Sequence, residues 1–161
     1  HRKLVQAAAR THRATGLTIA AHTGNGAAAR EELQTLRTEG VAASAFVWVH
    51  AQSESNRRMH VEAAQLGAWV EFDGIGPRSV TQHLELVSNL RDHGLLDRVL
   101  VSHDAGWYHV GEPGGGNYRG YETVFTEFVP ALRRAGFTAT DVNQVLVENP
   151  AAAFTIRTRP L

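Results

Sequence analysis

The sequence predicts an α/β fold of four consecutive βα units, which is half of an eight-unit (β/α)8 TIM barrel with parallel strands. Short apolar runs alternate with helical patterns along the chain, the order expected for a parallel sheet with right-handed crossovers. The runs begin roughly 22 to 31 residues apart, and a complete barrel uses about 31 residues per unit. Four strands cannot close such a barrel, so we expect two open sheet edges that invite pairing with another chain.

Four runs are predicted to be buried strands because each is short, apolar and bounded by glycine or polar residues. In chain order they read LTIAAH, AFVWVH, AWVEFD and VLVS. The predicted strands therefore cover 17–22, 45–50, 68–73 and 99–102.

The segments around these strands are predicted to be helices because their apolar residues fall on one helical face, as Ala29, Leu33 and Leu36 do. A glycine directly follows each of the first four segments and suits the end of a helix. The predicted helices cover 1–15, 27–39, 54–66, 78–93 and 121–135.

The last part of the chain contains a long loop and one more short helix. Residues 105–120 are rich in glycine, and long loops in compact domains are usually functional or mobile. Thr138 and Asp141 suit the start of the short helix. Asn149 and Pro150 are expected to end it, with Pro150 opening a final turn.

Composition excludes several classes of protein. The 161 residues carry no net charge and no basic stripe, so nothing favours nucleic acid or an anionic membrane as a partner. The absence of cysteine excludes disulfides and thiolate metal sites, which leaves nine histidines as nitrogen ligands. No apolar run approaches the about 20 residues that span a bilayer. The chain opens inside a helical pattern, so we expect the natural terminus to lie upstream. No signal peptide is visible, which favours a cytoplasmic location. No linker interrupts the pattern, so we expect a single domain over 1–161.

Three residues that can bind a metal close three of the predicted strands. They are His22, His50 and Asp104, on the first, second and fourth strands. Chemistry in a parallel barrel occurs at the carboxyl ends of its strands, so these side chains should come together. Imidazole and carboxylate suit zinc and its neighbours, which lower the pKa of bound water and polarise a substrate oxygen. The pattern predicts a metal-dependent hydrolase.

The strand motifs, taken in order, resemble the phosphotriesterase family of the amidohydrolase superfamily. The segments that carry the resemblance are TGLTIAAHTG, FVWVHAQSE, AWVEFDGIG, VLVSHDAGWY and VLVENPAAAF. They match the carboxyl-terminal half of that family's barrel. The resemblance implies that His22 and His50 end the fifth and sixth strands and bind one metal of a binuclear pair. It implies that Asp104 ends the eighth strand, binds the other metal and accepts a proton from the attacking hydroxide.

The chain departs from the family pattern in ways that bear on activity and substrate. The family's first-strand His-x-His pair and fourth-strand bridging lysine are absent, so either this is a fragment of a longer enzyme or a second polypeptide supplies the other half. Gly74 stands after Asp73 where the phosphotriesterase itself has histidine, and Ser53 replaces an acidic residue. The loop SHDAGWYHVGEPGGG is also more similar to hydrolases and lactonases of the wider family. Together these differences favour a lactone or another carboxylic ester over an organophosphate triester.

Further residues near the predicted ligands are candidates for substrate contact. Trp107, Tyr108 and His109 follow Asp104 and would form either a pocket wall or a plug on the barrel rim. Asp73 ends a strand and would either orient the substrate or cap a turn. His103 should point away from Asp104, as a partner of a ligand or as a packing residue. The histidines on predicted helices are expected at the surface or in caps, namely His1, His12, His60, His83 and His93.

Two other interpretations stay open at this stage. The chain could be a non-catalytic remnant or assembly module whose open edges pair with a partner. Because the sheet edges are open, we expect a homo-oligomer whether the chain is an enzyme or such a module. The half-barrel could also bind a single metal through two histidines and one carboxylate, a ligand set that supports other chemistry.

Overall fold

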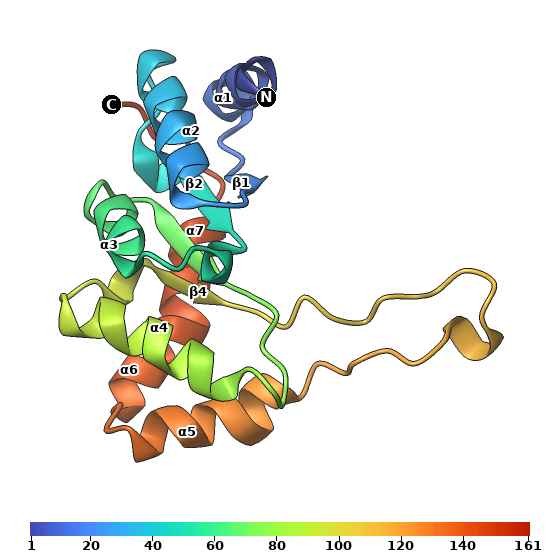
Figure 1. Ribbon diagram of the computed structural model, residues 1–161. Coiled ribbons are helices and arrows are strands. Elements are labelled where there is room, and N and C mark those ends of the chain that lie inside the picture. The colour runs from blue at the N-terminus through green and yellow to red at the C-terminus, as the bar shows by residue number, and fades with distance from the viewer.

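The computed structural model describes residues 1–161 and contains one parallel sheet of four strands. The strands lie side by side in chain order, so each crossover adds the next strand on the same side of the sheet (Figure 1). This stepwise order is the one that a barrel requires, and it confirms the predicted half-barrel fold. The first and last strands are the two edges of the sheet. The strands are β1 (Ile19–His22), β2 (Phe46–Val49), β3 (Trp69–Phe72) and β4 (Val99–Val101).

Helices occupy the segments where helical spacing predicted them. The Asn25 side chain accepts the Ala28 main-chain N–H at 3.0 Å and fixes the start of the second helix. Gly16 ends the first helix with φ of 75°, and a Cβ there would lie 2.8 Å from the main chain of Arg157. The helices are α1 (Arg2–Thr15), α2 (Gly26–Thr38), α3 (Arg57–Gln65), α4 (Val80–Asp92), α5 (Val129–Arg134), α6 (Ala139–Asn143) and α7 (Asn149–Phe154).

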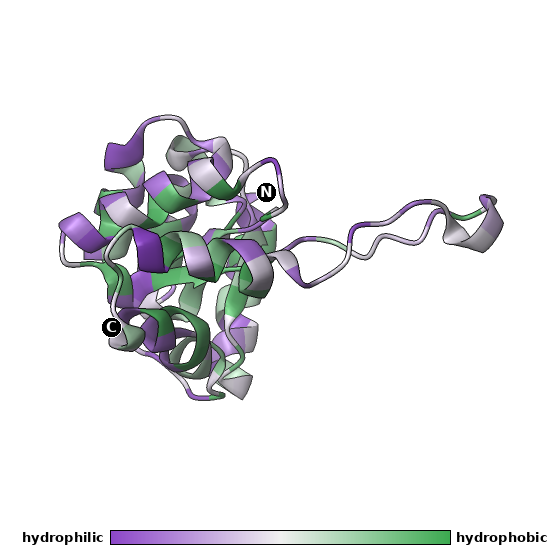
Figure 2. Cartoon of the chain, turned by 90° about the horizontal axis from the view of Figure 1, so that it is seen from below, coloured by the Kyte–Doolittle hydropathy of each residue, from purple (hydrophilic) through white to green (hydrophobic).

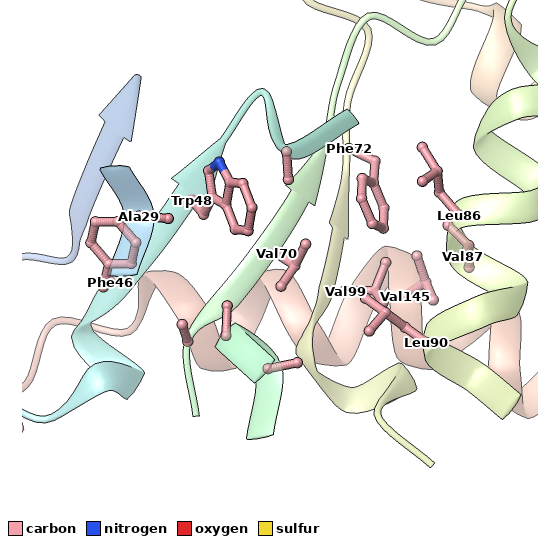
Figure 3. Close-up of a cluster of buried hydrophobic side chains, with 14 of the residues drawn as sticks. Ala29, Phe46, Trp48, Val70, Phe72, Leu86, Val87, Leu90, Val99 and Val145 are labelled. Carbon is pink, nitrogen blue, oxygen red and sulfur yellow. The ribbon is translucent and has the colours of Figure 1, made fainter. Parts of the chain in front are cut away.

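The two faces of the sheet bury different sets of side chains. One face packs against the helices and forms the main core, which Figure 3 shows around Trp48, Val70 and Phe72. The alternate residues Val47 and Trp69 point to the other face, where they join a small cluster with Leu100 and Ala153. Because successive strand residues face opposite sides, this second face is the one that lines the interior of a closed barrel.

The carboxyl-terminal helical segment lies at the amino ends of the strands. The Asn149 side-chain amide donates to the carbonyls of Leu96 at 2.8 Å and Val99 at 2.7 Å, at the start of β4. The Thr18 hydroxyl, just before β1, donates to the Ala153 carbonyl. This packing fixes one end of the sheet and leaves the carboxyl ends of the strands free for a site.

The prediction that Asn149 and Pro150 end the short helix was wrong, whereas the final turn predicted from Pro150 through Phe154 is present as α7. The helical run continues to Phe154, because a π-helical turn over Gln144–Glu148 joins α6 to α7. The Asn149 N–H donates to the Gln144 carbonyl five residues back. Such a turn makes room for a proline, whose ring clashes with the carbonyl four residues earlier in a regular helix. A second π turn, over Val124–Phe128, precedes Pro130 in the same way.

Three of the helical histidines were predicted at the surface or in caps but are buried. His12, His60 and His83 are at most 2% exposed, whereas His1 and His93 are exposed as expected. Each buried ring has a main-chain carbonyl within hydrogen-bond distance, which compensates for the loss of water. His12, for example, donates from Nδ1 to the Leu17 carbonyl at 2.7 Å and accepts the Arg159 N–H at Nε2, at 2.9 Å.

The glycine-rich loop 105–120 forms an arm that projects away from the body of the molecule (Figures 1 and 2). Its tip is a short turn at Pro113–Gly115, where the His109 N–H donates to the Gly115 carbonyl at 2.9 Å. Figure 2 shows both hydrophilic and hydrophobic residues along the arm. No helix of the chain has the length and apolar character needed to cross a membrane.

Candidate metal centre

The candidate site lies at the carboxyl ends of the four strands. His22 is the last residue of β1, His50 and Asp73 directly follow β2 and β3, and Asp104 lies three residues beyond β4. His50 and Asp104 are the only residues other than glycine with positive φ, at 64° and 42°. Backbone strain of this kind is found preferentially at functional sites. Two of the three residues predicted as ligands therefore stand in an unusual conformation.

The fold brings the predicted ligands together. The ring centroids of His22 and His50 are 4.1 Å apart, with the rings nearly perpendicular. A ring nitrogen of His50 and carboxylate oxygens of Asp73 and Asp104 all lie within 4.8 Å of one another. The ligand atoms that converge are therefore those of His50, Asp73 and Asp104, and His22 lies beside this group through its contact with His50.

Asp73 holds His50 in one orientation. Its Oδ1 accepts the His50 Nδ1–H at 2.7 Å and the Gln52 side-chain amide at 2.7 Å, and its Oδ2 accepts the His50 main-chain N–H at 2.8 Å. A carboxylate can only accept, so the proton of the ring is on Nδ1, and Nε2 is left with a free lone pair. This is the usual arrangement of a metal-binding histidine. The Asp73 side chain is 2% exposed, and the structure places it against His50.

Arg119 ties the base of the arm to the ends of β3 and β4. Its Nη2 donates to the carbonyl of Asp104 at 2.8 Å and also to that of His103, and its Nη1 lies 3.4 Å from the carbonyl of Gly74. The bond to Asp104 restrains the left-handed turn that presents its exposed carboxylate. A guanidinium suits this role because its several N–H groups reach separate carbonyls at once.

Glu71 is a nearby acidic residue that the sequence reasoning missed. It lies on β3 two residues before Asp73, and the Ser102 hydroxyl donates to its Oε1 at 3.0 Å. Burial raises the pKa of Glu71; the Ser102 bond opposes the rise, and the charges of Asp73 and Asp104 add to it. The signal was present in the sequence, because residues two apart on a strand face the same side.

His103 contacts the helix that follows the arm and also lines the cavity beside Asp104. Its Nε2 accepts the Val124 main-chain N–H at 2.9 Å, at the start of the helix that follows the arm. Burial lowers its pKa, and the Arg119 guanidinium lowers it further. Its role as a partner of a ligand or as a packing residue stays a prediction.

The three predicted substrate residues on the arm differ in their distance from the cluster. The Trp107 indole N–H donates to the Asp104 carbonyl at 3.2 Å, and this side chain lines a cavity of about 340 Å³ with Asp104 and Tyr121. Tyr108 and His109 lie further along the arm, where both are exposed. Their contact with a substrate, like that of Trp107 and Asp73, stays a prediction.

The residues present fit a divalent metal. His50 offers Nε2 because its other nitrogen is bonded to Asp73, His22 offers an exposed ring beside it, and Asp104 offers an exposed carboxylate. Imidazole nitrogen with carboxylate oxygen is a donor set of zinc and other first-row metals. His22 and His50 would hold one such metal, and Asp104 would hold the second metal of a binuclear pair.

Comparison with known proteins places these features in a family. A sequence model of the phosphotriesterase family matches residues 1–154. The phosphotriesterase homology protein of Escherichia coli (strain K12) is 36% identical over 156 residues, which are 94% of this chain and 52% of that protein. Its crystal structure, described as a complex with phosphate in the active site, matches with a TM-score of 0.81 over 95% of this chain and 53% of that chain.

Two further relatives carry names that describe an activity. The N-acetyltaurine hydrolase of Mus musculus is 28% identical, over 97% of this chain and 48% of that protein. The crystal structure of a lactonase from Listeria monocytogenes, 27% identical, matches with a TM-score of 0.84 over 98% of this chain and 50% of that chain. The chain spans about half the length of the curated relatives it matches.

Proposed function

Because the chain belongs to the phosphotriesterase family, we propose that it forms the carboxyl-terminal half of a metal-dependent hydrolase acting on a lactone or another carboxylic ester. The observation that carries this proposal is the position of His50. Its Nδ1–H is bonded to Asp73, its Nε2 is free, and both His22 and Asp104 lie beside it. A histidine oriented in this way by a buried carboxylate is prepared to bind a metal.

The residues of the chain divide the chemistry between them. His22 and His50 hold a divalent metal, which we take to be zinc, and Asp73 keeps His50 oriented. The metal supplies the acidity that makes water a nucleophile at neutral pH and polarises the substrate carbonyl. Asp104 accepts the proton of the water as its oxygen adds to the carbonyl carbon, and it returns a proton to the leaving oxygen as the C–O bond breaks. Trp107 borders the cavity where the acyl group would lie.

The remaining ligands would come from a second half-barrel. The sheet has free edges at β1 and β4, and the relatives are about twice as long as this chain. We infer that four more strands complete the barrel between these edges, either from the same polypeptide or from a second chain. The resemblance to the family implies that those strands carry the missing His-x-His pair and the bridging lysine.

The substrate assignment rests on the residues around the cluster and on the relatives. Gly74 and Ser53 stand where the phosphotriesterase itself has histidine and an acidic residue, which favours a lactone over an organophosphate triester. The lactonase from Listeria monocytogenes is consistent with this choice. The N-acetyltaurine hydrolase adds an amide to the carbonyl compounds worth testing. Water attacks the carbonyl carbon of a lactone or an amide and the phosphorus atom of a phosphotriester.

The test measures bound metal and hydrolysis together. The chain would be purified alone and in complex with the amino-terminal half of a relative, and each sample assayed with a panel of lactones, aryl esters, an N-acyl amide and a phosphotriester. We expect the zinc content and the lactonase activity to fall to background in His22→Ala and His50→Ala. The matched control is His93→Ala, an exposed histidine at the end of α4. Hydrolysis that persists in both alanine variants would contradict the proposal and favour a non-catalytic assembly module.

A further inference from the structure

Two βα units of the chain repeat the same buried histidine. His60 stands ten residues after His50, and His83 stands ten residues after Asp73. Each lies on the helix that follows its strand, α3 or α4, and is at most 2% exposed. Each ring reaches back to a main-chain carbonyl at the carboxyl end of the preceding strand. The repeat therefore connects the helix layer to both members of the His50–Asp73 pair.

His60 restrains the turn that presents His50. Its Nε2–H donates to the carbonyl of Ala51 at 2.8 Å, directly after the left-handed His50. Burial lowers the pKa of His60, so the ring is neutral and carries a single proton. That proton is on Nε2, and Nδ1 is buried with no hydrogen-bond partner. An apolar side chain would avoid this unpartnered nitrogen, so packing alone does not explain a histidine here.

His83 restrains Asp73 from the same side. Its Nε2 lies 2.6 Å from the Asp73 carbonyl, and its Nδ1 lies 2.8 Å from the Ser79 carbonyl. The Ser79 carbonyl already accepts the His83 main-chain N–H at 3.1 Å. The shorter contact is the one with Asp73, and there the ring N–H donates, because a carbonyl oxygen can only accept. The main chain of the carboxylate that orients His50 is thus itself held in place.

We propose that His60 and His83 are positioning residues that fix the main chain on both sides of the His50–Asp73 hydrogen bond and thereby direct His50 Nε2 toward the metal. This inference rests on the proposed metal-dependent function for its purpose, although the hydrogen bond it concerns joins two residues of the chain and can be observed by itself. Losing either restraint frees the turn at His50 or the carboxylate of Asp73, and the His50 ring can then adopt its other tautomer. Partners of metal-binding histidines change metal affinity by about 10- to 100-fold.

The experiment compares three buried histidines of one helix layer. His60→Leu and His83→Leu remove the ring donor and keep an apolar side chain, whereas His60→Gln and His83→Gln keep an N–H at a similar reach. His12→Leu is the matched control, because His12 also bonds a main-chain carbonyl but lies beside Leu17, before β1. If a leucine variant fails to fold, the methionine variant replaces it.

Two readouts are taken on the full chain. Nitrogen-15 NMR of the imidazoles, recorded without metal, reports which nitrogen of His50 carries the proton. Competition with a chromophoric chelator reports zinc affinity. We expect His60→Leu and His83→Leu to lose the single Nδ1–H state of His50 and to bind zinc about 10- to 100-fold more weakly. The glutamine variants should recover both properties, and His12→Leu should keep both even where it lowers stability.

The outcomes separate this inference from the proposed function. An unchanged His50 tautomer in the leucine variants, or an equal loss in His12→Leu, would overturn the positioning role. A wild-type chain that binds no zinc in complex with its other half would refute the metal-dependent function. The tautomer of His50 would still decide whether His60 and His83 position it.

Discussion

At the scale of single residues, the candidate centre depends on one hydrogen bond between two strand ends. His50 is held by Asp73 through both its ring and its main-chain N–H. These contacts determine the tautomer of the ring, the direction of Nε2 and the left-handed turn. A second partner, Gln52, bonds the same carboxylate oxygen at 2.7 Å and keeps it from rotating.

Replacing Asp73 with asparagine should impair metal binding, because Asp73 orients His50. The amide has a single acceptor oxygen, so it cannot accept from the ring and from the main chain in the same way. We expect Asp73→Asn to weaken zinc binding by about 10- to 100-fold, measured by chelator competition. Asp97→Asn, at an exposed position before β4, is the control and should bind zinc as the wild type does. Wild-type affinity in Asp73→Asn would refute the orienting role.

The buried ring of His60 should make stability depend on pH. Burial holds its pKa below the usual value of 6.5, so the unfolded chain takes up a proton at a pH where the folded chain does not. The stabilisation is complete above about pH 6.5 and is lost as the pH falls toward the folded pKa. Urea unfolding from about pH 7 to about pH 5 should show a smaller decline for His60→Leu than for the wild type. Parallel declines would show that other groups cause the dependence.

The position of the candidate ligands could be predicted from the sequence, whereas their hydrogen-bond partners could not. His22, His50 and Asp104 end apolar runs, so their place at the strand ends follows from the pattern. The bond between His50 and Asp73 depends on the turn at His50 and on the stagger of neighbouring strands, which no local pattern encodes. The burial of His83 had a signal that was overlooked, since Leu86, Val87 and Leu90 continue its helical stripe.

At the scale of secondary structure, helix ends and turns decide where the carboxyl-terminal segment lies. The run from α6 to α7 begins with a capping box, in which the Thr138 hydroxyl accepts the Asp141 N–H at 3.1 Å and the Asp141 carboxylate accepts the Thr138 N–H at 2.7 Å. Because α7 then reaches Val99 and the start of β4 through Asn149, this cap supports the sheet indirectly.

Removing this cap should destabilise the chain measurably. Thr138→Ala is expected to lower the free energy of unfolding by about 1 kcal/mol, determined by urea denaturation. The Thr138 main-chain N–H and then its hydroxyl lower the pKa of Asp141, so this contribution is present above the normal carboxyl range and is lost as the pH falls through the lowered pKa. Thr11→Ala on the exposed face of α1 is the control, and it should not reduce stability because alanine favours a helix. Equal free energies of unfolding for Thr138→Ala and Thr11→Ala would show that the cap contributes nothing.

At the scale of the whole molecule, the sheet is built for a closed structure. Helices cover one side of the sheet. On the other side, which carries Val47 and Trp69, the segment around Ala153 packs at the amino ends of the strands. The candidate ligands lie at the other end of this same face. The sequence predicted the half-barrel and its open edges, because unit length and strand order are local properties. It did not predict the projection of the arm 105–120 from the body, which depends on how the arm contacts the rest of the fold.

The assembly of two half-barrels can be tested at Ala20. This residue is exposed on β1, and in the sheet it lies beside Val47, on the face that we assign to the barrel interior. Ala20→Lys should leave the unfolding free energy of the chain alone within about 0.5 kcal/mol, as is usual for a surface change. The same lysine would be buried without a partner in the completed barrel, where an uncompensated charge costs several kcal/mol.

Sedimentation of the chain mixed with the amino-terminal half of a relative would measure this difference. We expect a one-to-one complex with the wild-type chain and with Ala7→Lys, whose added charge lies on the exposed surface of α1. With Ala20→Lys we expect the two halves to sediment separately. Unimpaired association of Ala20→Lys would mean that this face stays in contact with water, and a completed barrel could not then be the structure in which the chain functions.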